Sequence, residues 1–220
     1  MTRALIMGPP GAGKGTQAER VAENFNMTHL SSGDIFRAEK ESDSPLGRQV
    51  SEVMARGELV SDELVVQVML KAISEVDGGL LLDGFPRTLP QAESLDKALG
   101  DHGIGIDAVI LIKANDNIIV ERITGRRYCP RCGKGFHVKF MPSARDEYCD
   151  ECDGNVKLVQ RDDDTESVVR QRLKAYYDQT EPVVEYYRQS DNVKVLEIDG
   201  MRTPDEVSLS ISKSLSEFIK

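Results

Sequence analysis

The chain has 220 residues, of which 40% are hydrophobic and 30% charged, so it can bury a core and is neither disordered nor fibrous. Its formal net charge of −9 argues against nonspecific attraction to nucleic acid. The N-terminal stretch lacks the pattern of a signal peptide, and no apolar run is long enough to span a membrane. We therefore expect a cytoplasmic protein with neither a membrane nor a nucleic-acid partner.

Short apolar runs alternate with helical patterns along the chain. The third run is nearly continuous, as in a parallel strand covered on both faces, whereas the fourth alternates like a less covered strand. The runs predicted as strands are 2–7, 79–83, 107–113 and 192–199. The stretches predicted as helices are 61–76, 89–99, 115–123, 165–188 and one that begins at 203–206. This order predicts an α/β fold with a central parallel sheet flanked by helices.

Two segments interrupt the alternation. Residues 31–60 have the pattern of short helices broken at 42–45 and at Gly57, which predicts a helical insertion. Residues 125–161 carry all four cysteines and show little helical periodicity, which predicts a second insertion. The remaining segments, 1–30, 61–124 and 162–220, are expected to form a discontinuous core domain.

The stretch GPPGAGKGT at 8–16 follows the first strand and opens a helix. Its glycines allow backbone N–H groups to turn toward one anion, and the helix N-terminus adds partial positive charge. Lys14 would reach the β- and γ-phosphates of a nucleotide. The usual pattern places a magnesium-binding hydroxyl directly after the lysine, but here Gly15 delays the hydroxyl to Thr16. The context favours a phosphate-binding loop over an ordinary glycine-rich turn.

The cysteines form two pairs, Cys129-Pro-Arg-Cys132 and Cys149-Asp-Glu-Cys152, separated by sixteen residues. Two such pairs predict a closed tetrahedral site for a structural Zn²⁺ ion. Two local disulfides or free thiols are the alternatives, and a cytosolic location disfavours disulfides. A closed four-sulfur site has no catalytic role.

The loop resembles that of the adenylate kinases and related nucleoside monophosphate kinases, in which GKGT is usual. The resemblance extends to SSGDIFR at 31–37, to GELVSDE at 57–63 and above all to DGFPRT at 83–88, with Gln91 beyond it. It covers residues 1 to about 205, because the arginines at 122, 126, 127, 161 and 172 fall where the family's remaining arginines fall.

The resemblance implies a monomer that uses Mg²⁺ to transfer phosphate reversibly between ATP and AMP, giving two ADP. In the family magnesium is held mainly by nucleotide phosphates and water, so a late hydroxyl is tolerated. The residues implied to bind ATP are Gly11, Ala12, Gly13, Lys14, Gly15, Thr16, Arg122, Arg126, Gly135, Phe136 and Arg202. Those implied to bind AMP are Ser32, Arg37, Glu58, Leu59, Val60, Gly84, Phe85, Pro86, Arg87, Gln91, Arg161 and Arg172. Those implied in catalysis are Lys14, Asp83, Arg87, Arg122, Arg126, Arg161 and Arg172.

The residue types suit these roles. The planar guanidinium group binds phosphate oxygens in pairs and stays charged when partly desolvated, so a converging cage of arginines is expected. The amide of Gln91 both donates and accepts, which matches N1 and the N6 amino group of adenine. Asp83 would orient the water shell of magnesium. The cysteine-bearing insertion would form a lid over ATP, with His137 packing or touching nucleotide rather than binding metal.

Three other functions fit parts of the sequence. The nearest is a kinase for UMP, CMP or GMP, although Gln91 and the long lid favour AMP. A zinc-ribbon ATPase that binds nucleic acid is disfavoured by the acidic residues around the cysteines. A nucleotide sensor without turnover is the third, and an activity assay separates it from an enzyme.

Overall fold

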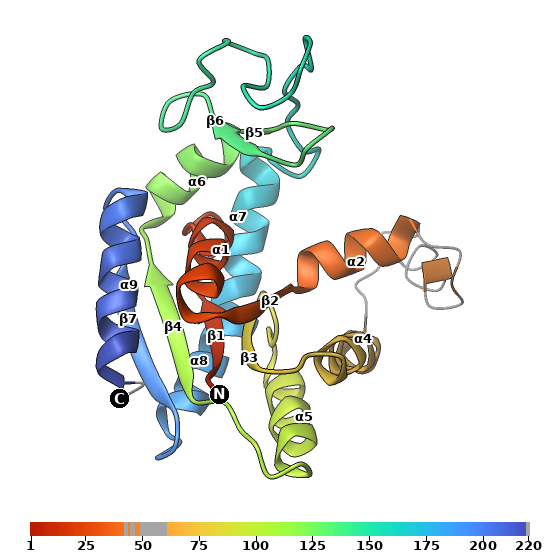
Figure 1. Ribbon diagram of the computed structural model, residues 1–220, viewed down its shortest axis with the longest axis vertical. Helices are drawn as coiled ribbons and strands as arrows, with labels where there is room; N and C mark the ends of the chain where they lie inside the picture. The colour runs from red at the N-terminus through yellow and green to blue at the C-terminus, as the bar shows by residue number, and fades with distance from the viewer. Residues whose placement is uncertain (42–43, 45–46, 49–60, 219–220) are drawn as a thin grey trace.

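The central sheet positions the residues of the candidate site. The computed structural model describes residues 1–41, 44, 47–48 and 61–218. Within them, five parallel strands lie in the order β2-β3-β1-β4-β7 (Figure 1). Their bounds are Arg3–Met7 for β1, Met27–Ser31 for β2, Gly79–Asp83 for β3, Ala108–Lys113 for β4 and Lys194–Asp199 for β7. Because the strands are parallel, their carboxyl ends meet at one edge, where α/β proteins bind ligands.

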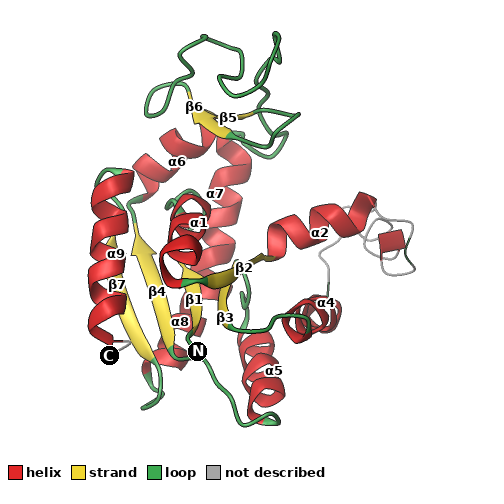
Figure 2. Cartoon of the chain, in the orientation of Figure 1, coloured by secondary structure: helices red, strands yellow, loops and turns green. Residues whose placement is uncertain are grey.

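Helices cover both faces of the sheet (Figure 2). One face packs against α1 (Lys14–Phe25) and α9 (Pro204–Phe218) through residues such as Ile6 and Ile110. The other packs against α4 (Asp62–Ser74), α5 (Leu89–Gly100) and α8 (Glu181–Arg188) through residues such as Leu5 and Val109. Alternate residues of β1 and β4 therefore point into opposite hydrophobic cores, which explains the continuous apolar runs.

A smaller unit lies beyond the carboxyl edge. Helices α6 (Asp116–Thr124) and α7 (Glu166–Ala175) pack together and lead to and from it. It contains a short antiparallel pair, β5 (Arg126–Tyr128) and β6 (Gly135–His137), and several isolated bridges. Helix α2 (Ser32–Glu41) projects separately from the end of β2 (Figure 1).

The α/β fold with its parallel sheet is confirmed, and the four predicted strands are present. The alternating strand, β7, lies at an edge. The prediction missed β2, a short strand at the opposite edge. The predicted helix 165–188 was wrong in one respect, because a π-helical turn, η1 (Tyr176–Thr180), separates α7 from α8. In the described part of the chain, no helix is both long and apolar enough to cross a membrane.

Candidate functional site

The loop after β1 has the backbone of an anion-binding nest. Gly8, Gly11 and Gly13 all adopt positive φ angles, of 141°, 77° and 100°. A side chain at Gly8 would overlap the carbonyl oxygen of Ile112, so the close packing of the loop on β4 requires glycine there. Gly13 directly precedes α1, whose N-terminus therefore opens toward the loop.

Lys14 lies across this loop. Its Nζ atom donates hydrogen bonds to the carbonyl oxygens of Gly8 at 2.8 Å and Pro9 at 2.9 Å. Burial of the ammonium group lowers the pKa of Lys14 to about 8, and the charges of Arg87 and Arg172 oppose protonation while Asp83 favours it. These four side chains therefore lie close enough to act on one another at the carboxyl edge of the sheet.

Asp83 ends β3 beside the loop. One of its carboxylate oxygens lies 3.5 Å from Nε2 of His29. A Cβ atom at position 15 would lie 4.0 Å from the same carboxylate, which is an ordinary contact distance, so Gly15 lies beside Asp83. Thr16, in contrast, is exposed to solvent. Magnesium favours carboxylate oxygens and retained water, so the carboxylate of Asp83 suits a hydrated Mg²⁺ ion.

Arg87 and Arg172 approach Lys14 from the two sides of the sheet edge. Arg87 donates from Nε to the carbonyl of Gly84 at 2.6 Å. Displacement of water from its guanidinium lowers the pKa of Arg87, and the charge of Arg172 lowers it further. Arg172 donates to Asp163 at 2.9 Å from the last turn of α7. Three cations thus crowd one region, which is favourable only if anions occupy it.

A second group of arginines lies where α6 and α7 meet the lid. Arg126 makes two hydrogen bonds to the carboxylate of Asp164, whose side chain is fully buried. Arg161 lies over the ring of Tyr128, 5.7 Å from its centre. Burial is the main cause that lowers the pKa of Arg161, and the charge of Arg126 lowers it further. Burial also lowers the pKa of Arg122, which has no ion-pair partner in the described part of the chain.

Carboxylates pair with most of these predicted phosphate-binding arginines. Besides Asp163 and Asp164, Asp34 pairs with Arg37 and Asp199 pairs with Arg202. Each partner is near in sequence to its arginine or lies in the acidic run 162–164. The positive charges of these four arginines are therefore balanced locally.

The turn after β3 lies at the same carboxyl edge of the sheet as the phosphate loop. Ser32 is 3% exposed and donates to the carbonyl of Gly84 at 2.8 Å, while Phe85 is buried and joins Pro86 through a cis peptide bond. Gln91 is 4% exposed. Its Nε2 donates to Asp62 at 2.6 Å, and its Oε1 accepts the backbone N–H of Arg87 at 2.8 Å.

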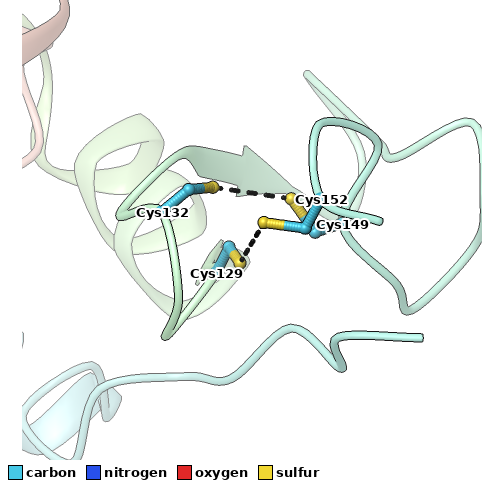
Figure 3. A group of neighbouring side chains, drawn as sticks. All are labelled: Cys129, Cys132, Cys149 and Cys152. Carbon is cyan, nitrogen blue, oxygen red and sulfur yellow. Dashed lines mark hydrogen bonds between the residues drawn. The ribbon is translucent and has the colours of Figure 1, made fainter. Parts of the chain in front are cut away.

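The four cysteine sulfurs of the lid point toward one another (Figure 3) and all lie within 4.8 Å. The Sγ atoms of Cys129 and Cys152 are 3.7 Å apart, as are those of Cys132 and Cys149. A disulfide needs about 2.05 Å. A tetrahedron with Zn–S bonds of about 2.3 Å has edges of about 3.8 Å, so the four thiols fit a zinc ion. Burial raises the pKa of Cys129, but hydrogen bonds, led by those from the N–H groups of Cys132 and Arg131, outweigh it and lower that pKa to about 6.

Comparison with known proteins decides the family. A family model described as adenylate kinase matches residues 6–192. A protein named adenylate kinase from Carboxydothermus hydrogenoformans is 48% identical over 217 residues, which cover 98% of this chain and 100% of that protein. Those from Petrotoga mobilis and Clostridium botulinum are 45% and 44% identical, and the matches cover 99% and 97% of this chain and 99% and 98% of the relatives.

The chain belongs to the adenylate kinase family.

In this member of the adenylate kinase family, Lys14, Asp83, Arg87 and Arg172 lie near one another, whereas other predicted residues are buried or lie elsewhere. The side chain of Phe136 is buried with Cys129 and Cys149 in the core of the lid, so only its backbone is available to a nucleotide. His137 lies away from the cysteines, because its Nδ1 accepts the N–H groups of Lys139 and Phe140 and its Nε2 lies 3.1 Å from the carbonyl of Glu121. Three predicted AMP-binding residues, Glu58, Leu59 and Val60, lie outside the described residues.

Sequence reasoning missed the acidic residues of this adenylate kinase site. Asp62 holds Gln91, and Asp34, Asp163 and Asp164 hold arginines. The acidic run 162–164 was visible in the sequence, but its pairing with Arg126 and Arg172 depends on the fold. Asp62 belongs to the stretch GELVSDE, which carries part of the resemblance, but nothing in the sequence indicated its contact with Gln91.

The lowered pKa of Lys14 predicts that the protein takes up protons when it binds MgATP. A bound polyphosphate stabilises the ammonium form, so we expect MgATP binding at pH 8 to take up about half a proton per chain, because a pKa of about 8 leaves Lys14 half protonated before binding. The uptake should fall toward zero at about pH 6.5, where Lys14 is already charged. Titration calorimetry in buffers of different ionisation enthalpy measures it. The Lys14→Arg variant, which stays charged, should take up none, and equal uptake by both proteins would contradict the prediction.

Proposed function

We propose that this protein transfers the γ-phosphoryl group of ATP to AMP, reversibly and with Mg²⁺, to give two ADP. The observation that carries the proposal is the convergence of Lys14, Arg87 and Arg172 beside Asp83 at the carboxyl edge of the sheet. The phosphate loop lies on one side of this cluster and the Gly84–Arg87 turn on the other. Two phosphorylated ligands can therefore meet there.

The phosphate loop binds the triphosphate. Its inward N–H groups, Lys14 and the N-terminus of α1 neutralise the β- and γ-phosphates. Asp83 would hold the water shell of a Mg²⁺ ion that enters with ATP, and the ion would supply further positive charge for the phosphate oxygens. Arg122 and Arg126 come from the lid side and Arg202 from the loop after β7.

The monophosphate binds at the Gly84–Arg87 turn, on the other side of the cluster from the phosphate loop. Arg87 and Arg37 hold its phosphate, and Arg161 and Arg172 bridge toward the transferred group. Transfer between two phosphates needs alignment and charge neutralisation rather than a strong base, so positively charged groups suffice. Burial is the main cause of the lowered pKa of Lys14 and Arg87, and the charges of neighbouring cations add to it. Bound phosphates would favour the charged forms of both groups.

We further propose that the molecule has three parts: a core of 1–30, 61–124 and 162–220, an AMP-binding insertion at 31–60 and a lid at 125–161. Lid closure, for which adenylate kinases are a standard example, excludes water and limits ATP hydrolysis. A zinc ion on the four cysteines braces the lid and takes no part in transfer. We also propose that the protein is a cytoplasmic monomer that acts on free nucleotides.

The test is the formation of ADP from ATP and AMP with magnesium, followed in a coupled assay. Omission of AMP should leave only slow hydrolysis of ATP. A panel of AMP, GMP, UMP and CMP should show preference for AMP. No ADP, or equal rates with another monophosphate, would contradict the proposal.

Gln91 is expected to select the base. The Gln91→Ala variant should lose kcat/KM for AMP by about tenfold or more, because two hydrogen bonds to adenine disappear, while the KM for ATP changes less than twofold. The ratio of kcat/KM for AMP to that for GMP should fall. Unchanged discrimination would remove Gln91 from the adenine site.

A further inference from the structure

The amide of Gln91 is fixed in one orientation by groups of opposite polarity. Nε2 faces a carboxylate oxygen of Asp62, which can only accept, and Oε1 faces the backbone N–H of Arg87, which can only donate. Turning the amide over would place an acceptor against the carboxylate and a donor against the N–H. Both hydrogen bonds would be lost inside a buried site, so the turned orientation is strongly disfavoured.

Asp62 is itself held in place. Its second carboxylate oxygen accepts from Thr88 Oγ1 at 2.9 Å, while the first accepts from Gln91 at 2.6 Å. It is the first residue of α4, where a negative charge is favourable. Thr88 also caps α5, the helix that carries Gln91. The two helix N-termini are thus joined through Asp62.

These contacts leave Gln91 with one N–H and one lone pair for a ligand. Adenine presents an acceptor at N1 and a donor at its amino group, and guanine presents the reverse, a donor at N1 and an acceptor at O6. An amide that could turn over would suit either base, whereas a fixed amide suits one. The orientation of Gln91 therefore decides between the two purines, and the Asp62 carboxylate is the side chain that, together with the backbone N–H of Arg87, fixes this orientation.

We propose that Asp62 is a positioning residue that makes the site select AMP over GMP, by preventing the Gln91 amide from turning over. This inference rests on the proposed function, in which Gln91 binds the base. Asp62 itself needs no contact with the nucleotide.

The test compares Asp62→Asn with Glu63→Gln. Both remove one negative charge from the first turn of α4, but Glu63 is exposed and does not contact Gln91. The amide introduced by Asp62→Asn can donate to a turned Gln91, so we expect the AMP-to-GMP ratio of kcat/KM to fall about tenfold in that variant. Glu63→Gln should keep the ratio within about twofold, and the KM for ATP should stay close to wild type in both.

A purely structural role would give a different result. Equal losses with AMP and GMP, or a ratio unchanged in Asp62→Asn but lowered in Gln91→Ala, would overturn the inference and leave the proposed function intact. An unchanged ratio in Gln91→Ala, or no AMP preference in the wild type, would instead count against the proposed function.

A second substitution gives a test that does not depend on Asp62→Asn alone. Asp62→Ala removes the acceptor that holds Nε2 of Gln91 and supplies no other hydrogen-bonding group. The AMP-to-GMP ratio of kcat/KM should fall in this variant as in Asp62→Asn, and thermal unfolding shows that the variant is folded. A folded Asp62→Ala protein with the wild-type ratio would overturn the inference.

Discussion

Arg172→Met is expected to lower kcat by about a thousandfold or more while leaving the fold intact. The long apolar replacement keeps the packing of α7 but removes a cation that faces Lys14 and Arg87. A guanidinium that neutralises charge on a phosphoryl group in transfer contributes on the order of 10³ to 10⁵ in rate. Steady-state rates with ATP and AMP, together with thermal unfolding, measure both effects.

Arg170 provides the matched control for this variant. It lies on the same helix, is exposed and pairs with Glu166 one turn away. Arg170→Met should therefore change kcat less than about twofold, because an exposed i,i+4 ion pair contributes little. Similar losses in both variants would mean that Arg172 acts through helix stability rather than on the phosphates.

Loss of one cysteine is expected to remove the metal and to lower the midpoint of thermal unfolding by about 10 °C. Elemental analysis of the wild-type protein should find one zinc ion per chain, and Cys132→Ser should hold none. A metal bound only to the folded state adds its binding free energy to stability, and for a chain of this size each kcal/mol corresponds to roughly 2–4 °C.

The control for the cysteine variant is the chelator itself. Chelation should lower the unfolding midpoint of the wild type toward that of Cys132→Ser and should leave the variant unchanged. A wild type that contains no zinc, or a variant as sensitive to chelator as the wild type, would contradict the zinc site.

Features that depend on short stretches of sequence were the most predictable. The phosphate loop joins a strand to a helix within a few residues, and its glycines carry the required backbone angles. The cysteine pairs lie on two turns of one local unit, so their spacing alone indicated that the four sulfurs meet.

Features that depend on packing between distant parts of the chain could not be predicted from the sequence. Strand β2 contains Thr28, His29 and Ser31 and pairs with only β3, so it lacks the apolar run of a central strand. The π-helical turn η1 comes just before Pro182, in the first turn of α8. Proline has no backbone N–H and interrupts a continuous helix, but the helical pattern of 165–188 was predicted as uninterrupted. The contact between Asp62 and Gln91 joins two helices, and nothing within either helix indicates it.

The carboxylates that pair with the arginines affect the unliganded protein as well as the reaction. A phosphate that bound Arg37, Arg126, Arg172 or Arg202 would displace Asp34, Asp164, Asp163 or Asp199, so part of the attraction would be spent on an exchange of anions. When ADP departed, the same aspartates would return to these four arginines. This exchange of anions would favour turnover in both directions, because a reversible enzyme must release ATP and AMP, or two ADP, at comparable rates.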